Sequence, residues 1–167
     1  KGKRMKIEGA VSIVEGNIEA IDQGIALIES ISDEQYNFIA RPYVSSAIGE
    51  HFRHVVDMFN AVIDSADTID YDRRRRGADI EPQRLVAIEE LGAVRRWMHH
   101  CLDDINTRFS GLQDGLTVRT EVKINETCSV GIPSSRLREL VFASSHAVHH
   151  YALISVIAKL QGIRLAE

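Results

Sequence analysis

Residues 48–62 read IGEHFRHVVDMFNAV, and their apolar side chains recur at intervals of four and three residues. The recurring positions are Ile48, Phe52, Val55, Phe59 and Val62. This period places all five side chains on one side of an α-helix that begins near Ala47. The same stretch carries His51 and His54. This one segment therefore predicts a helix that packs on the core and two histidines that are candidates for a functional site.

Three other segments show the same helical period. Residues 7–28 carry seven apolar side chains on one stripe. The third stripe consists of Leu85, Ile88, Leu91, Met98, Leu102 and Ile105. A last helix is expected from about Arg136 to Gln161, where Gly162 ends it. The expected starts are Ser45 or Ser46 as N-cap of the second helix, Pro82 in the first turn of the third, and Ser134 or Ser135 before the fourth.

Between the third and fourth helices the period changes to two. Residues 116–124 alternate apolar or threonine side chains with polar ones, which is typical of a half-buried strand. A second strand, residues 128–132, is expected to pair back onto it before Pro133 closes the excursion. Four amphipathic helices bury their stripes most simply as a bundle. We therefore predict an all-α protein, a four-helix bundle with a small β-hairpin insert between the third and fourth helices.

Length and composition narrow the class of protein. A chain of 167 residues is expected to fold as one domain, residues 1–167, with a core large enough to need no disulfide or structural metal. A net charge of −4 argues against a nucleic acid or an anionic membrane as partner. Uninterrupted apolar runs are only a few residues long, so no membrane span is expected. Cys101 and Cys128 form no CxxC pair, which favours the cytoplasm.

The seven histidines form clusters in the expected helices. His146 and His150 are four residues apart, so their rings project from one face and can chelate one divalent ion. Zinc or nickel is the expected ion, with iron and manganese as alternatives. A third ligand from another helix would leave a coordination position open, as in catalytic sites. His149 is expected to point away from this face.

The remaining histidine pair and its neighbour have a simpler interpretation. His99 and His100 are adjacent on the third helix, and exposed or hydrogen-bonded side chains are expected there. Cys101 is expected to be a small buried hydrophobic residue. Phosphate-loop, serine-hydrolase, zincin and dinucleotide motifs (GxxxxGK, GxSxG, HExxH and GxGxxG) do not occur in the sequence. The histidines are therefore the chemical signal that remains.

The third ligand can be either histidine of the second helix. On a helical wheel, His51 lies about 60° from the centre of the apolar stripe and His54 about 120° from it. The wheel therefore favours His51 mildly. A bundle helix contacts two neighbours, however, so a side chain at the flank of the stripe can also face the interior, and both residues stay candidates.

These segments resemble the DinB/YfiT-like superfamily, four-helix bundles with a three-histidine metal site. Residues 48–57, IGEHFRHVVD, are similar to the family pattern IGELLxHxxD, and residues 145–154, SHAVHHYALI, to its pattern HxxxHR. The resemblance implies His54, His146 and His150 as the metal ligands. His51 and His149 then become alternative ligands or partners of a ligand. Tyr151 stands where many members have arginine.

The resemblance also implies a chemistry, because the superfamily includes thiol-dependent S-transferases. An ion held by three neutral imidazoles lowers the pKa of a bound water to about 7 and deprotonates a bound thiol. We expect a transferase that uses a low-molecular-weight thiol and acts on a small molecule, or a hydrolase. The alternative is a non-catalytic bundle that binds metal or a small ligand in a stress-related role.

The run Arg73, Arg74, Arg75 and Arg76 has two interpretations. Guanidinium groups can clamp the carboxylates of an anionic thiol, which would make the run a substrate-binding segment. Alternatively, it is a solvated loop neutralised by Asp67, Asp70 and Asp72, and this second interpretation is the one favoured from the sequence. Long apolar helix faces also favour a homodimer.

Overall fold

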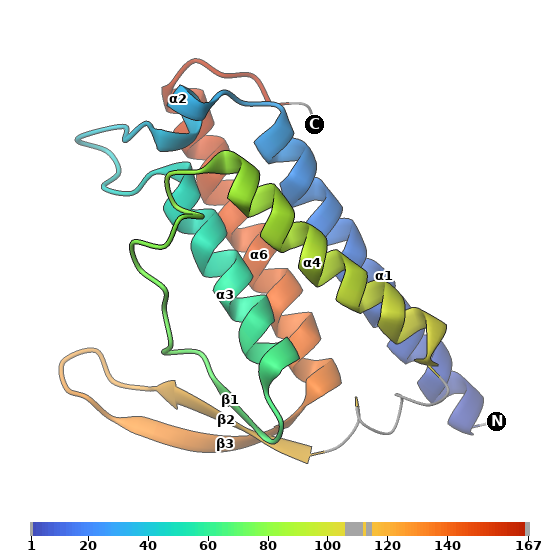
Figure 1. The fold of residues 1–167 in the computed structure, drawn as a ribbon. Helices are drawn as coiled ribbons and strands as arrows, with labels where there is room; N and C mark the ends of the chain where they lie inside the picture. The colour runs from blue at the N-terminus through green and yellow to red at the C-terminus, as the bar shows by residue number, and fades with distance from the viewer. Residues whose placement is uncertain (1, 106–111, 113–114, 166–167) are drawn as a thin grey trace.

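Four long helices lie side by side in the computed structural model, which describes residues 2–105, 112 and 115–165 (Figure 1). They are α1 (Gly2–Glu29), α3 (Ile48–Asp64), α4 (Arg84–Asp103) and α6 (Arg136–Leu160), and a short α2 (Asp33–Asn37) follows α1. α1 packs against α4 and α6, and α3 packs against the same two helices, so each long helix has two neighbours. The predicted four-helix bundle is confirmed.

The predicted apolar stripes of α1 and α3 form much of the core. Ile21 and Ile28 of α1 are fully buried, and so are Phe52 and Phe59 of α3. The stripe of α4 differs from the prediction. Leu85 has 68% of its surface exposed. Leu91 and Met98 are buried as predicted, whereas Ile88 and Leu102 are only partly buried. The buried face of α4 consists of Ala87, Leu91, Val94, Met98 and Cys101, which are again spaced by four and three residues.

Two helix starts also differ from the prediction. The N-cap residue of α3 is Ala47, whose backbone N–H donates to the Glu50 carboxylate at 2.7 Å. The hydroxyl of Ser46 therefore does not cap the helix and is free for a contact described below. α4 begins at Arg84, two residues after Pro82. The N-cap of α6 is Ser135, as predicted, and its hydroxyl accepts from the Arg138 N–H.

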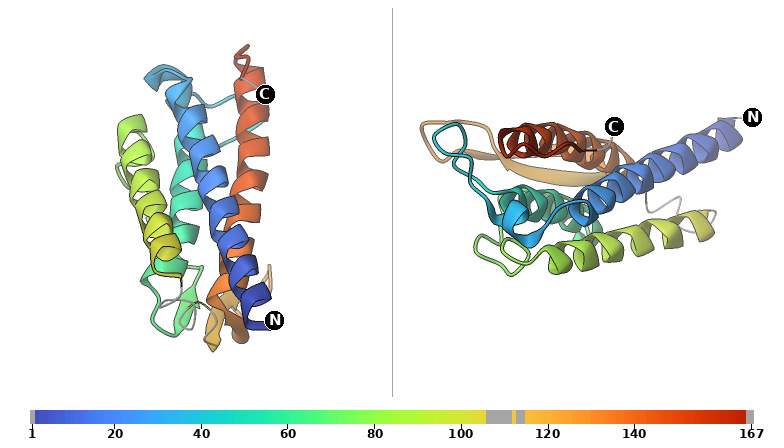
Figure 2. Two further views of the ribbon diagram at one scale, coloured as in Figure 1. Left: turned by 90° about the vertical axis from the view of Figure 1, so that its right-hand side faces the viewer. Right: turned by 90° about the horizontal axis from the view of Figure 1, so that it is seen from above.

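A small sheet lies at one end of the bundle, as the views in Figure 2 show. β2 (Gly115–Glu121) and β3 (Ser129–Ser135) form the predicted antiparallel hairpin, in which Val118 faces Ile132. Pro133 was predicted to close the hairpin but lies within β3; its missing N–H is tolerated there because β3 is an edge strand. β2 ends at Glu121, so Val122 and Ile124 are exposed at 51% and 100%.

The structure adds a third strand that the sequence did not predict. β1 (Thr68–Asp70) follows α3 and pairs in parallel with β2. Because α3 and α4 both run toward the sheet end of the bundle, the chain after β1 must return along α3 to the start of α4 (Figure 1). This return segment, residues 71–83, carries the arginine run past α3, where Arg75 contacts Asp57.

α6 contains a long window of high mean hydropathy. Among the described residues it is the one helix long and apolar enough to cross a membrane by length and composition, with 33% of its most apolar window buried. The individual apolar runs are short, which is why the sequence did not suggest a span. A single helix of this kind is weak evidence for a membrane span, and α6 packs on α1 and α3.

Candidate metal centre

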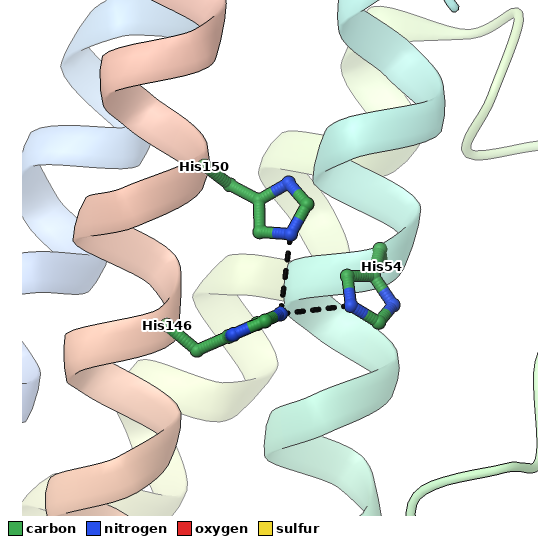
Figure 3. Close-up of side chains that lie close together, drawn as sticks. All are labelled: His54, His146 and His150. Carbon is green, nitrogen blue, oxygen red and sulfur yellow. Dashed lines mark hydrogen bonds between the residues drawn. The ribbon is translucent and has the colours of Figure 1, made fainter. Parts of the chain in front are cut away.

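Three histidine rings meet in the seam between α3 and α6. His54 projects from α3, and His146 and His150 project from successive turns of α6 toward it (Figure 3). The Nε2 atom of His146 lies 2.9 Å from Nε2 of His54 and 3.1 Å from Nε2 of His150. One nitrogen from each ring lies within 4.8 Å of the other two, and all three residues are half-buried. The structure thus brings together the three residues that the family resemblance singled out.

This donor set fits a divalent ion. Tetrahedral coordination with bonds of about 2.0–2.1 Å separates two nitrogen ligands by about 3.3 Å. The two Nε2 separations of 2.9 and 3.1 Å are close to this value, so small side-chain rotations suffice. The three residues therefore fit a metal ion. Within the described chain, no fourth histidine, cysteine or carboxylate belongs to the group.

The protonation state of the rings also suits metal binding. Burial, reinforced by the charge on His146, lowers the pKa of His54 to about 4. Burial, reinforced by the neighbouring histidines, lowers the pKa of His150 to about 3. Burial lowers the pKa of His146 as well. At neutral pH the three imidazoles are neutral, and each has a lone pair available to a cation.

His51 lies beside the cluster rather than in it. Its Nδ1 atom is 2.9 Å from Nδ1 of His150, and its Nε2 atom is 3.0 Å from the Ser46 hydroxyl. When His150 offers Nε2 to an ion, its proton is on Nδ1 and is donated to Nδ1 of His51. His51 then donates from Nε2 to Ser46. This row of contacts fixes both the tautomer and the orientation of His150.

The other histidines lie outside the cluster. His149 is exposed, and its ring centre lies 6.2 Å from that of His146. His99 and His100 are exposed on α4, and Cys101 is buried, as expected from the sequence. The helical wheel favoured His51 because it measured distance from the core stripe. His54 reaches the cluster because its side of α3 faces α6.

Arg75 differs from the other three arginines of the run because its side chain is paired with carboxylates. The Arg75 guanidinium bonds to Asp57 at 2.6 Å and to Glu90 at 2.7 Å, and its backbone N–H also donates to Asp57. Asp57 is buried one turn after His54, so this ion pair fastens the return segment beside the cluster. The expectation that nearby aspartates neutralise the run is wrong for Arg75. The Asp70 and Asp72 carboxylates accept backbone N–H groups instead.

Within the arginine run, Arg74 is the residue whose charge acts on the histidine cluster, and the buried Arg53 of α3 also acts on His54. Arg74 lowers the pKa of both His54 and His146. Among the described residues, no carboxylate forms an ion pair with Arg73, Arg74 or Arg76, and all three side chains are exposed. Arg73 and Arg74 line a cavity of about 830 Å³ between α3 and the return segment. An unpaired cation therefore lies near the histidines.

Sequence reasoning missed two contributors to this region, Ser46 and Phe142. Ser46 was expected to cap α3, and its contact with His51 depends on the loop before the helix. Phe142 reads as an ordinary apolar residue of α6, yet its ring centre lies 5.8 Å from that of His146. Its position four residues before the candidate ligand His146 is the sequence pattern that could have predicted this contact.

A four-helix bundle in which three histidines converge is compatible with a metal-binding protein. The chain belongs to the DinB superfamily, whose family model matches residues 19–154. The comparison with curated proteins found no match. The comparison with solved structures found none either.

Proposed function

We propose that this protein is a divalent-metal-dependent enzyme that transfers a small anionic thiol to an electrophile. The observation that carries the proposal is the meeting of three neutral imidazoles, His54, His146 and His150, in a half-buried seam. Zinc or nickel is the proposed ion, and iron and manganese are the alternatives. When bound, the ion supplies Lewis acidity, which lowers the pKa of a thiol or a water beside the histidines.

The described part of the protein supplies three ligands and no fourth. Structural zinc sites are closed by four protein ligands, whereas catalytic sites keep a position open. Asp57 is the acidic residue nearest in sequence to His54 on α3, and it is held by Arg75 at 2.6 Å. It is therefore not available to close the site. This supports a reactive site over a structural one.

One unpaired charge near the histidines, that of Arg74, supports an anionic substrate. Arg74 has no ion pair with a described residue, and its charge acts on His54 and His146. A guanidinium group binds carboxylates with two parallel hydrogen bonds. We therefore assign Arg74 the role of holding a carboxylate of the thiol. Arg75 has a different role, because its guanidinium is already paired with Asp57 and Glu90.

Metal content tests the first step of the proposal. Elemental analysis of untagged protein is expected to give about one equivalent of metal, lost in His54→Ala and His146→Ala. His51→Ala is the comparison that separates the two histidines of α3, and we expect it to retain metal at saturating concentration. Protein that binds none of zinc, nickel, iron and manganese would contradict the proposal.

Turnover tests the second step. A carboxylate-bearing thiol is supplied with an aryl halide, and loss of free thiol is followed in the metal-loaded protein. In this reaction the thiolate sulfur forms a bond to the ring carbon, the halide leaves with the electrons of the carbon–halogen bond, and the thiol proton goes to water. Arg74→Gln is expected to raise KM for the thiol with little change in kcat, and Arg96→Gln, on an exposed site of α4, is the matched control. Ester hydrolysis without thiol transfer would favour the second candidate, a hydrolase. Metal binding without either reaction would leave a non-catalytic binding protein.

A further inference from the structure

A row of side chains on α6 leads to the histidine cluster. Arg138, Phe142 and His146 are spaced four residues apart, so they lie along one side of the helix. The guanidinium carbon of Arg138 is 5.3 Å from the centre of the Phe142 ring. That ring is 5.8 Å from the His146 ring. The row therefore runs from an exposed cation, across an aromatic face, to a candidate metal ligand.

A cavity of about 500 Å³ opens beside this row, between α6 and the sheet. Val118 and Ile132, which face each other across β2 and β3, form its sheet side together with Pro133. Phe142 faces them from α6. The volume is in the range of small-molecule sites, which combine apolar walls with a few polar groups that fix orientation.

The one acidic group in the wall is already compensated. Glu139 is fully buried, and its carboxylate accepts from the Tyr71 hydroxyl at 2.6 Å, from the Ser134 hydroxyl and from Arg138 at 2.7 Å. A carboxylate with these three donors has little capacity left for a cationic ligand. Arg138 makes its ion pair through Nη1, and its side chain remains 64% exposed. Arg138 also lines the cavity.

We propose that this cavity binds the aromatic body of an anionic substrate. Its carboxylate or sulfonate group pairs with Arg138, and its ring packs against Phe142 with its far end directed toward His146. The proposal deepens the proposed function and rests on it, because it assigns a site to the electrophile that the thiol attacks. Arg74 and Arg138 then hold different substrates, since they belong to different cavities.

The test uses 1-anilinonaphthalene-8-sulfonate, an aromatic sulfonate whose fluorescence rises in apolar surroundings. Ile132→Glu places a negative charge at the cavity wall and is expected to raise the Kd of this probe at least tenfold. Val130→Glu is the matched control, because Val130 is on the same strand with similar exposure, 37% against 46%, and does not line the cavity. Arg138→Gln is expected to weaken binding likewise, and Arg119→Gln, at an exposed site of β2, is not.

Two results would overturn the assignment of the cavity. One is folded wild-type protein that does not bind the probe, and the other is equal Kd values for Ile132→Glu and Val130→Glu. Circular dichroism and thermal melting of both variants show whether each is folded. The exposed apolar side chains of α6 offer another place for the probe, and binding there would leave all four variants like wild type.

A second measurement tests whether the bound aromatic molecule extends toward His146. In protein shown by elemental analysis to hold cobalt, probe fluorescence is expected to be quenched relative to zinc-loaded protein, because cobalt absorbs visible light and quenches only at short range. Unquenched fluorescence would contradict this placement. The two proposals fail separately. Protein that binds the probe in the cavity but binds no metal would refute the proposed function, and metal-loaded protein with an unresponsive cavity would refute only the present inference.

Discussion

His51 is not one of the three candidate metal ligands; it accepts a hydrogen bond from His150. His51→Leu removes that acceptor, and we expect the affinity for zinc to fall about 10–100-fold, as for other partners of metal-bound histidine. His51→Asn keeps an oxygen near the position of Nδ1 and should retain most of the affinity. Competition with a chromophoric chelator measures both values, with His149→Leu as an exposed control. Equal affinities in His51→Leu and wild type would show that the 2.9 Å contact has no role in orienting His150.

The lowered pKa values of the cluster predict how stability depends on pH in the metal-free protein. Burial lowers the pKa of His54 to about 4 and that of His150 to about 3, whereas both titrate near 6.5 in the unfolded chain. Between these values the unfolded chain binds protons that the folded chain does not. The free energy of unfolding is therefore not reduced by these two histidines above pH 6.5, and it decreases as the pH falls below that value.

The melting temperature should therefore be level above about pH 7 and decrease as pH falls below the unfolded-state pKa. His150→Gln removes one of these rings, so the variant should show a shallower decrease than wild type over the same range. Carboxylates contribute equally to both proteins, which makes the difference between the two curves the informative quantity. Parallel curves would contradict the assigned pKa of His150.

At the scale of elements, the start of α3 is fixed by a close approach to the segment before α4. A Cβ atom on Gly49 would lie 1.8 Å from the Glu81 carbonyl oxygen and 2.7 Å from the Tyr36 ring. The Tyr36 hydroxyl donates to the Ile80 carbonyl at 2.8 Å, which holds this segment in place. Gly49→Ala is therefore expected to destabilise the protein by about 1–3 kcal/mol or more.

Gly16→Ala is the matched control for this substitution. Gly16 lies inside α1 and has no atom within 4 Å of the added Cβ, so alanine should stabilise the helix by about 0.5–1 kcal/mol. Urea unfolding gives both free-energy differences. A neutral Gly49→Ala variant would mean that α3 can move away from Glu81, and with it the loop that brings Ser46 to His51.

At this scale, an element could be predicted from the sequence when its repeating pattern was long enough to recognise. The stripes of α1 and α3 repeat over four or more turns, so their period is unambiguous. The alternation at residues 116–124 predicts the first strand of the hairpin, which the structure ends at Glu121. β1 has three residues, too few to show a period, and its partner strand lies far along the chain. Leu85 was misassigned because the first turn of a helix adds little to the phase of a stripe.

At the scale of the whole molecule, the candidate site depends on contacts between distant segments. His146 and His150 could be paired from their spacing alone, because four residues make one turn of α6. The choice of His54 required the neighbour of α3 to be known, and local periodicity does not contain that information. The partners of Arg75 were missed for the same reason, since Asp57 and Glu90 lie on α3 and α4 and are brought to it by the return segment.

The same topology predicts that metal binding stabilises the whole fold. The ligands are on α3 and α6, which are separated by more than 70 residues of chain, so an ion joins two helices that the unfolded chain leaves apart. At a free zinc concentration of 100 times Kd, stability should rise by about 2.7 kcal/mol, or roughly 5–10 °C in Tm. Differential scanning fluorimetry with and without a chelator measures this shift. It should disappear in His146→Ala and persist in His149→Ala. An undiminished shift in His146→Ala would place the stabilising ion elsewhere, because two remaining ligands hold an ion far more weakly than three.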